Sequence, residues 1–328
     1  MTPSNVLVVA DMNAREVAPR LRVDFPNLTI TVVSTEEEAE PYRAETEILL
    51  TLGHLMTTDM IARMPRLQWV QSLVVGTDKL LPVLRGRDEL LVTNCRGVHG
   101  PQIAEMCVVH MLVLNRDIRG FMDDQRNHVW NYERGGEGRL LRDKTVAIVG
   151  LGIVGQALAP LCKAHGMTVY GVSHAVSDCD GVDRYFRRDA LLAVAAEVDF
   201  LVLAVSLTND TIGLIDARVL DAMKPTAYLI NVTRGAVVDE DALVAALRSG
   251  SIAGAGLDAL TREPRERRAK VPEDSPLWDL DNVFITPHVS GSCDVYPDKI
   301  YPIVHRNMRH FLAGEREKMV NVIDRRGS

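Results

Sequence analysis

Short apolar runs alternate with helix-like stretches along the whole chain, and this alternation predicts an α/β protein. An apolar run of roughly 4–8 residues between turn residues favours a strand over a helix. In residues 1–97 the expected strands are Val6–Ala10, Leu28–Val33, Ile48–Leu52, Leu67–Leu73 and Leu90–Thr93. No glycine-rich dinucleotide-binding motif appears among them.

A long helix is expected after Pro101, because apolar residues recur there at helical spacing. Its stripe consists of Ile103, Met106, Cys107, His110, Met111 and Leu114, and Val109 and Val113 broaden it. A helix this apolar is expected to pack on more than one partner and to bridge domains or subunits. We interpret His110 as a core histidine with satisfied hydrogen bonds rather than as a catalyst.

The alternation becomes regular from Thr145 onward, and the strands there are almost wholly apolar. Such runs predict a parallel sheet covered by helices on both faces. The expected strands are TVAIVG (145–150), MTVYGV (167–172), Asp199–Ala204, Ala227–Asn231, SIAGAGLD (251–258) and NVFITP (282–287), with helices at Ile153–His165 and Asp239–Leu247.

The C-terminal tail contains one more helical pattern, KIYPIVHRNMRHFL, which Pro302 must interrupt or kink. Because the tail is too short for a domain, we expect it to return to the N-terminal domain. The predicted organisation is one domain of residues 1–97 plus 292–328 and a second domain of residues 98–291, since 328 residues suffice for two cores.

Composition narrows the class only slightly. A net charge of −7 argues weakly against a nucleic-acid surface. Arg262, Arg265, Arg267, Arg268 and Lys270 cluster, but Glu263, Glu266, Glu273 and Asp274 lie among them, which favours a solvated loop. Five scattered cysteines without metal-ligand spacing indicate a reducing compartment. No signal peptide or membrane span is recognisable, so a cytoplasmic protein without a membrane or nucleic-acid partner is expected.

Gly150, Gly152 and Gly155 match G-x-G-x-x-G between an expected strand and an expected helix, which is the context of a dinucleotide site. The first glycine permits the tight turn, the second lets a pyrophosphate approach the backbone, and the third lets helix and strand pack closely. At the end of the next strand, Ser173 and His174 stand where a carboxylate would bind the ribose 2′-hydroxyl. The pattern therefore favours NADP(H), and NAD(H) stays open.

Arg234, Glu263 and His288 each follow an apolar strand-like run. Taken singly, they are equally well explained by surface salt bridges and a loop histidine. Together they suit hydride transfer to a keto acid: His288 donates the proton, Glu263 orients it and favours its protonated form, and Arg234 binds the carboxylate.

The segments VGLGIVGQALA, INVTRGAVVDEDAL, GLDALTREP and NVFITPHVSG resemble, in this order, the D-isomer-specific 2-hydroxyacid dehydrogenase family. The resemblance covers nearly the whole chain. It implies two Rossmann-like doubly wound parallel-sheet domains with the active site in the cleft between them, and it makes the discontinuous domain the substrate domain and residues 98–291 the dinucleotide-binding domain. It also implies Arg234, Glu263 and His288 as catalytic residues and a homodimer.

The same resemblance implies the binding residues. Backbone amides of Val75 and Gly76 would bind the substrate carboxylate together with Arg234 and His288, and Asp258 would bind the nicotinamide amide. The full set of expected cofactor contacts is Gly150, Gly152, Ile153, Val154, Gly155, Ser173, His174, Ala204, Ser206, Thr211, Val232, Thr233, Asp258, His288 and Gly291. The chain departs from the family at Val74 and Val75, where Gly-Ala is common, and at Ser206, where proline is common. The first departure narrows the substrate loop and argues against bulky 2-oxo side chains.

The expected activity is reduction of glyoxylate, hydroxypyruvate or a similar 2-oxo acid to the D-2-hydroxy acid. Phosphoglycerate, phosphite and formate dehydrogenases are less favoured, because a C-terminal regulatory domain, a loop lysine and a glutamine partner are not found in this sequence. A cofactor-sensing binding protein resembling the corepressors of this fold is the alternative from another class. Trp130 is expected either to pack or to reach a neighbouring subunit.

Overall fold

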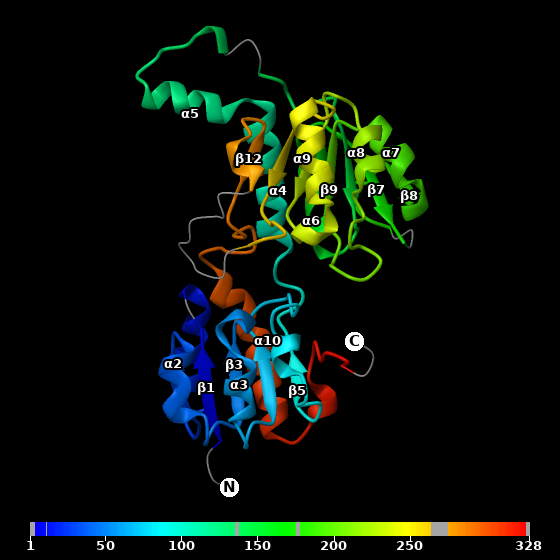
Figure 1. The fold of residues 1–328 in the computed structure, drawn as a ribbon. Coiled ribbons are helices and arrows are strands. Elements are labelled where there is room, and N and C mark those ends of the chain that lie inside the picture. Colours follow the sequence, from blue (N-terminus) through cyan, green and yellow to red (C-terminus); the bar gives the residue numbers. More distant parts are fainter. Residues whose placement is uncertain (1–3, 11, 135–137, 175–177, 264–274, 326–328) are drawn as a thin grey trace. The chain divides into compact units, whose positions relative to one another are not determined.

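The computed structural model describes residues 4–10, 12–134, 138–174, 178–263 and 275–325. The chain divides into two compact units, residues 1–98 with 292–328 and residues 99–291 (Figure 1). Arg265, Arg267, Arg268 and Lys270, with the acids Glu266, Glu273 and Asp274, lie outside the described residues.

The first unit is built on a five-stranded parallel sheet in the order β2-β1-β3-β4-β5. The expected strands of this segment are confirmed: β1 is Asn5–Val9, β2 Thr29–Val33, β3 Ile48–Thr51, β4 Trp69–Ser72 and β5 Leu91–Thr93. The helices are α1 (Val17–Asp24), α2 (Glu36–Ala39), α3 (Thr58–Ala62) and α10 (Tyr296–Leu312), with short 3₁₀ turns at Met12–Glu16, Glu40–Tyr42, Gly53–Leu55, Leu81–Leu84 and Arg316–Lys318.

Helix α10 belongs to the same core as the N-terminal strands, although it comes from the end of the chain. Ile300, Val304 and Met308 are fully buried against a cluster that includes Val6 and Val8. Of the two outcomes expected of Pro302, interruption of the helix is wrong, because α10 is continuous from Tyr296 to Leu312, and a kink stays a prediction. Pro302 lies on the exposed face of the helix, so its ring and the carbonyl it leaves unpaired are not forced into the core.

The second unit contains a seven-stranded parallel sheet in the order β12-β11-β10-β9-β6-β7-β8. Its strands are β6 (Thr145–Val149), β7 (Thr168–Ser173), β8 (Arg184–Arg187), β9 (Phe200–Leu203), β10 (Tyr228–Asn231), β11 (Gly254–Leu257) and β12 (Val283–Ile285). Its helices are α4 (Gly100–Asn115), α5 (Ile118–Arg126), α6 (Ile153–Ala164), α7 (Leu191–Glu197), α8 (Ala217–Ala222) and α9 (Glu240–Ser249), with 3₁₀ turns at Arg188–Ala190, Gly235–Val237 and Pro276–Asp279.

Both faces of this sheet are covered, which explains why its inner strands are apolar on both faces along most of their length. Val146, Ile148 and Val202 point into one cluster that includes residues of α4 and α6. Ala147 and Leu203 point into the other, with residues of α7, α8 and α9. Strand order reverses direction between β9 and β6, so the carboxyl ends of these strands form the topological switch point at which such sheets bind ligands.

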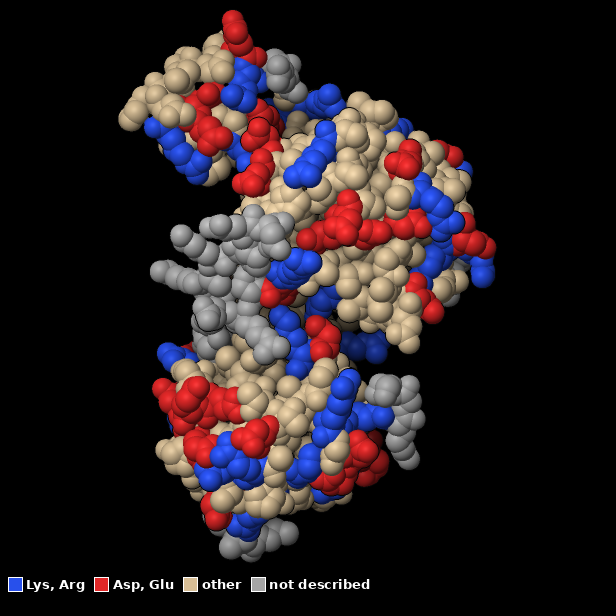
Figure 2. Space-filling model, in the orientation of Figure 1, with Lys and Arg blue, Asp and Glu red and all other residues tan. Residues whose placement is uncertain are grey.

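Strand β8 is not foreseen by the apolar pattern. It is one of the two edge strands of the sheet, and its residues Arg184 and Arg187 are exposed. An edge strand needs no apolar residue on every position, because its outer side faces solvent. Acidic and basic side chains are interspersed on the face of the molecule drawn in Figure 2. Among the described residues, no helix is both long enough and apolar enough to cross a membrane.

Candidate active site

The glycine-rich turn joins β6 to α6, and two of its glycines, Gly150 and Gly155, are required by close contacts within the chain. Gly150 has a φ of +106°, and a Cβ there would lie 2.7 Å from the Ala204 carbonyl oxygen. A Cβ on Gly155 would lie 2.2 Å from the Gly150 carbonyl oxygen, so helix and turn are in direct contact. A Cβ on Gly152 would meet nothing within 4 Å. Gly152 is also the N-cap of α6, so open space lies over the positive end of a helix, which suits a pyrophosphate.

The expected cofactor contacts Ile153 and Val154 lie in the first turn of α6, and Ser173 is the last residue of β7. His174, directly after β7, is exposed. Ala204 and Ser206 follow β9, and the Thr211 hydroxyl donates to the Ser206 carbonyl at 2.8 Å. These residues share the carboxyl edge of one parallel sheet.

Val232 and Thr233 follow β10, where Asn231 shapes the chain before Arg234. The Asn231 carboxamide oxygen accepts from Thr233 Oγ1 at 2.7 Å and from Thr233 N at 3.0 Å. Its Nδ2 donates to the Arg234 carbonyl at 3.0 Å. A buried asparagine therefore closes the turn that carries Arg234.

Arg234, Glu263 and His288 come together at the same edge of this sheet. His288 Nδ1 lies 2.7 Å from Glu263 Oε1, and Arg234 Nη1 lies 3.4 Å from His288 Nε2. Because a carboxylate can only accept, His288 Nδ1 carries a proton and donates it in a hydrogen bond to Glu263. The other ring nitrogen, Nε2, faces the guanidinium of Arg234. The His288 side chain is 36% exposed, so its ring is accessible to a small molecule.

His288 has a φ of +54°, the left-handed region that a non-glycine residue enters only at a cost of about 1–3 kcal/mol. Asp258 holds it there. The Asp258 carbonyl accepts from His288 N at 2.8 Å, and its carboxylate accepts from Val289 N and Ser290 N, both at 3.0 Å. Buried Asp258 thus accepts three hydrogen bonds from backbone N–H groups of the strained turn and stabilises it.

The hydrogen bonds that lie behind this turn were not identified from the sequence. They join Thr286 to Asp258 and to His110. The Thr286 hydroxyl donates to Asp258 Oδ1 at 2.6 Å and lies 3.1 Å from His110 Nε2. Because the hydroxyl proton is used on Asp258, Thr286 accepts the proton of His110 Nε2. No local pattern could reveal this contact, since the two residues are 176 positions apart.

His110 is fully buried, in agreement with a core histidine, but the expectation that its hydrogen bonds are satisfied holds only for Nε2. Its Nδ1 has no hydrogen-bond partner among the described residues, because the ring packs against Gly256 of β11, where a Cβ would come within 2.6 Å of that nitrogen. Burial lowers the pKa of His110 to about 4, against the opposing charge of Asp258.

Val75 and Gly76 lie in the other unit, in the loop after β4. Three carbonyls of this loop are occupied: Leu73 accepts from the Tyr296 hydroxyl at 2.6 Å, Val74 from Cys95 N at 3.2 Å, and Val75 from Asn94 Nδ2 at 2.8 Å. No described residue accepts a hydrogen bond from the backbone N–H of Val75 or Gly76. Two amide donors therefore remain for a ligand.

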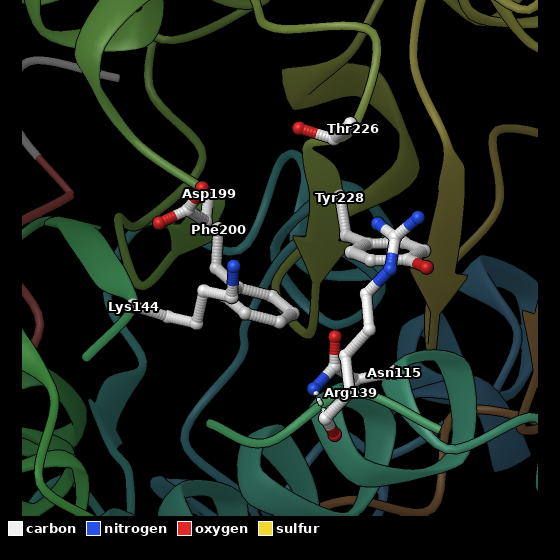
Figure 3. A pocket seen from close by; sticks show the side chains of 7 residues that line it. All are labelled: Asn115, Arg139, Lys144, Asp199, Phe200, Thr226 and Tyr228. Atoms are coloured by element: carbon white, nitrogen blue, oxygen red, sulfur yellow. Dashed lines mark hydrogen bonds between the residues drawn. The ribbon is translucent and has the colours of Figure 1, made fainter. Parts of the chain in front are cut away.

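A separate, shallow surface pocket is lined by Asn115, Arg139, Lys144, Asp199, Phe200, Thr226 and Tyr228 (Figure 3). Lys144 and Asp199 directly precede β6 and β9, so this pocket is at the amino edge of the sheet, opposite the glycine-rich turn. Ligands of parallel α/β sheets bind at the carboxyl edge, and the pocket contains none of the expected site residues. Among the described residues no cluster of His, Cys, Asp or Glu forms a metal site.

Comparison with known sequences matches residues 108–290 to the family described as "D-isomer specific 2-hydroxyacid dehydrogenase, NAD binding domain". A glyoxylate reductase from Pyrococcus furiosus is 31% identical over 312 residues, which cover 89% of this chain and 91% of the relative.

Solved structures agree over the full length. A D-isomer specific 2-hydroxyacid dehydrogenase family protein from Aeromonas salmonicida subsp. salmonicida A449 aligns with a TM-score of 0.86 and 32% identity, covering 98% of this chain and 99% of the other. An NADPH-dependent glyoxylate/hydroxypyruvate reductase from Sinorhizobium meliloti, solved with NADP and malonate, aligns with a TM-score of 0.79 and 27% identity, covering 98% and 97%.

Proposed function

This chain belongs to the D-isomer-specific 2-hydroxyacid dehydrogenase family, and we propose that it reduces glyoxylate, hydroxypyruvate or a similar small 2-oxo acid to the D-2-hydroxy acid. The observation that carries the proposal is the contact of His288 Nδ1 with Glu263 at 2.7 Å, with Arg234 Nη1 at 3.4 Å from Nε2. An anion-binding fork next to an oriented imidazole suits a keto acid better than a neutral ketone.

When bound, the dihydronicotinamide supplies a hydride to the carbonyl carbon of the substrate. The carbonyl oxygen then gains negative charge, and His288 donates a proton to it from Nε2. Glu263 fixes the orientation of the ring and carries the charge that balances the imidazolium. In the reverse direction the neutral Nε2 accepts the hydroxyl proton.

Arg234 anchors the substrate carboxylate, and its proximity to Nε2 keeps the keto oxygen within reach of the proton donor. The amides of Val75 and Gly76 provide a further anchor for the same carboxylate, supported by the absence of any described acceptor for them. Val74 and Val75 are half-buried in this loop, which favours a substrate with a small side chain.

The cofactor is proposed to be NADP(H). The glycine-rich turn fits a dinucleotide, because Gly152 leaves open space at the N-terminus of α6. Ser173 and His174 offer hydrogen-bond donors where an NAD-preferring site has a carboxylate. The NADPH dependence of the relative from S. meliloti supports the same preference. We assign dinucleotide binding to residues 98–291 and substrate recognition to residues 1–97 with 292–328.

We also propose a homodimer that uses the face around α5. Phe121, Met122, Val129, Trp130 and Tyr132 are exposed within one short segment, and Trp130 is 92% exposed. Apolar surface gathered in this way marks an interaction site in a stable protein. Sedimentation of the wild-type chain as a monomer at micromolar concentration would contradict a dimer.

The direct test is the loss of dihydronicotinamide absorbance when NADPH is mixed with the enzyme and glyoxylate or hydroxypyruvate. We expect turnover with at least one of them and a D-configured product by chiral chromatography. Pyruvate and a branched 2-oxo acid serve as comparison substrates and should react more slowly. Tight cofactor binding without turnover on any 2-oxo acid would favour a cofactor-sensing binding protein instead.

A further inference from the structure

The pairing of β7 with β8 brings an arginine next to the end of β7. The two strands are parallel, and Ser173 is level with Arg187 in their register. Neighbouring strands are about 4.8 Å apart, so these two backbones are direct neighbours at the carboxyl edge of the sheet. The sequence separates them by a loop, part of which lies outside the described residues.

Both side chains project from the face of the sheet on which the glycine-rich turn lies. A Cβ on Gly171 would come within 2.7 Å of Leu151 Cδ1, and Leu151 belongs to that turn. Because strand residues alternate between faces, Ser173 shares the face of Gly171. Partners in the register share a face as well, so Arg187 projects there beside Ser173.

Arg184, on the other face of β8, also lies on the same face as its register partner. It is level with Tyr170, and its Nη1 donates to the Tyr170 hydroxyl at 2.9 Å. Tyr170 packs in the cluster on the opposite side of the sheet from Leu151. Arg184 and Arg187 are therefore equal charges on one strand that point away from each other.

The Arg187 guanidinium is not paired with any other described residue. No hydrogen bond or ion pair joins Arg187 to another described residue, and its side chain is exposed. Arg188 follows it, and Arg188 Nη1 is buried without a described hydrogen-bond partner. With Asp189 as the next residue, this strand end carries two cations and one carboxylate, so its net charge is positive.

We propose that Arg187 binds the 2′-phosphate of NADP(H) and thereby sets the cofactor preference. In this fold the adenosine ribose lies between the glycine-rich turn and the end of the second strand, which is Ser173 here. A guanidinium there binds a phosphate through two parallel N–H···O bonds, and the Ser173 hydroxyl donates a further one. The inference rests on the proposed dinucleotide site and adds the residue that distinguishes the two cofactors.

Binding of cofactor fragments tests the proposal without turnover. Calorimetry compares 2′,5′-ADP, which carries the 2′-phosphate, with 5′-AMP, which does not. Arg187→Gln should weaken 2′,5′-ADP binding by about 10- to 100-fold, as expected for lost bonds to a charged group, and change 5′-AMP binding less than about twofold. Arg187→Lys should restore only part of the affinity, because an ammonium lacks the fork.

Arg184→Gln is the matched control, since it removes the same charge from the same strand on the other face, and it should leave both fragments unaffected. Equal losses in Arg187→Gln and Arg184→Gln would overturn the proposal in favour of a general field effect, and so would unchanged 2′,5′-ADP binding in Arg187→Gln. Turnover of glyoxylate by the wild-type enzyme is measured separately. Reduction of glyoxylate together with unchanged 2′,5′-ADP binding in the variant would therefore refute this inference alone.

Discussion

The pH dependence of protein stability tests the packing of His110 behind the candidate active site, because this buried side chain is titratable. The side chain is 0% exposed, and Nε2 has one hydrogen bond, at 3.1 Å to Thr286. Nδ1 has no described partner, so a second proton there would be buried without an acceptor. Burial accordingly lowers the pKa of His110 from 6.5 to about 4.

The pH changes the free energy of unfolding through His110 wherever the unfolded and the folded chain differ in how much proton this side chain binds. Above pH 6.5 the ring is neutral both in the folded and in the unfolded chain, and pH has no effect through it. As the pH falls from 6.5 to about 4, the unfolded chain binds a proton that the folded chain does not, so the free energy of unfolding decreases. At about 1.4 kcal/mol per pH unit, this window corresponds to about 3 kcal/mol.

The assay is urea unfolding followed by circular dichroism at pH 7, 6, 5 and 4, with His110→Gln as the reference. Glutamine keeps a donor for Thr286 but does not titrate, so the difference between the two proteins isolates His110 from all other groups. We expect the wild type to lose about 3 kcal/mol more than the variant between pH 7 and pH 4.

His165→Gln is the control, because His165 is an exposed histidine of the same unit. This substitution should leave the pH dependence of the free energy of unfolding as it is in the wild type. Parallel stability curves for wild type and His110→Gln would refute the reasoning. They would mean that the folded protein accepts a proton on His110 as readily as the unfolded chain, and hence that the site is hydrated.

Four further predictions concern the proposed reaction. His288→Ala should lower kcat by about 10²- to 10⁴-fold while leaving cofactor binding near normal, and a loss of cofactor affinity instead would contradict its role as proton donor. Arg234→Lys should lower kcat/KM by about 10-fold or more, because a point charge cannot replace the bidentate fork; wild-type kinetics would exclude carboxylate binding by Arg234. Gly152→Ala should keep the melting temperature but weaken cofactor binding, whereas Gly155→Ala should unfold at lower temperature, since its Cβ would lie 2.2 Å from a carbonyl oxygen. Ser173→Asp should shift the ratio of kcat/KM values towards NADH, and an unchanged ratio would remove Ser173 from the 2′-phosphate site.

Local patterns were sufficient for the elements that depend on local causes. The apolar strands of the second sheet are readable because each is buried on both faces, and Gly250 marks the end of α9 because it takes the left-handed conformation, with a φ of +73°. Strand β8 could not be found in this way, since an edge strand with exposed arginines lacks the apolar run. The sequence likewise shows Pro302 but not that it faces solvent, where α10 continues past it without interruption.

By itself the sequence determined the fold class, the family and the position of the glycine-rich turn, and it singled out Arg234, Glu263 and His288 as the proposed catalytic residues, because each follows from a run of neighbouring residues. Only the tertiary structure decided how His288 is held and what lies beside Ser173. The strained backbone of His288 depends on Asp258, and Asp258 is linked through Thr286 to a histidine on α4. Arg187 lies next to Ser173 only because β7 and β8 pair in one register. Such contacts depend on strand register and helix packing, which join residues far apart in the chain and leave no periodicity in the sequence around either of them.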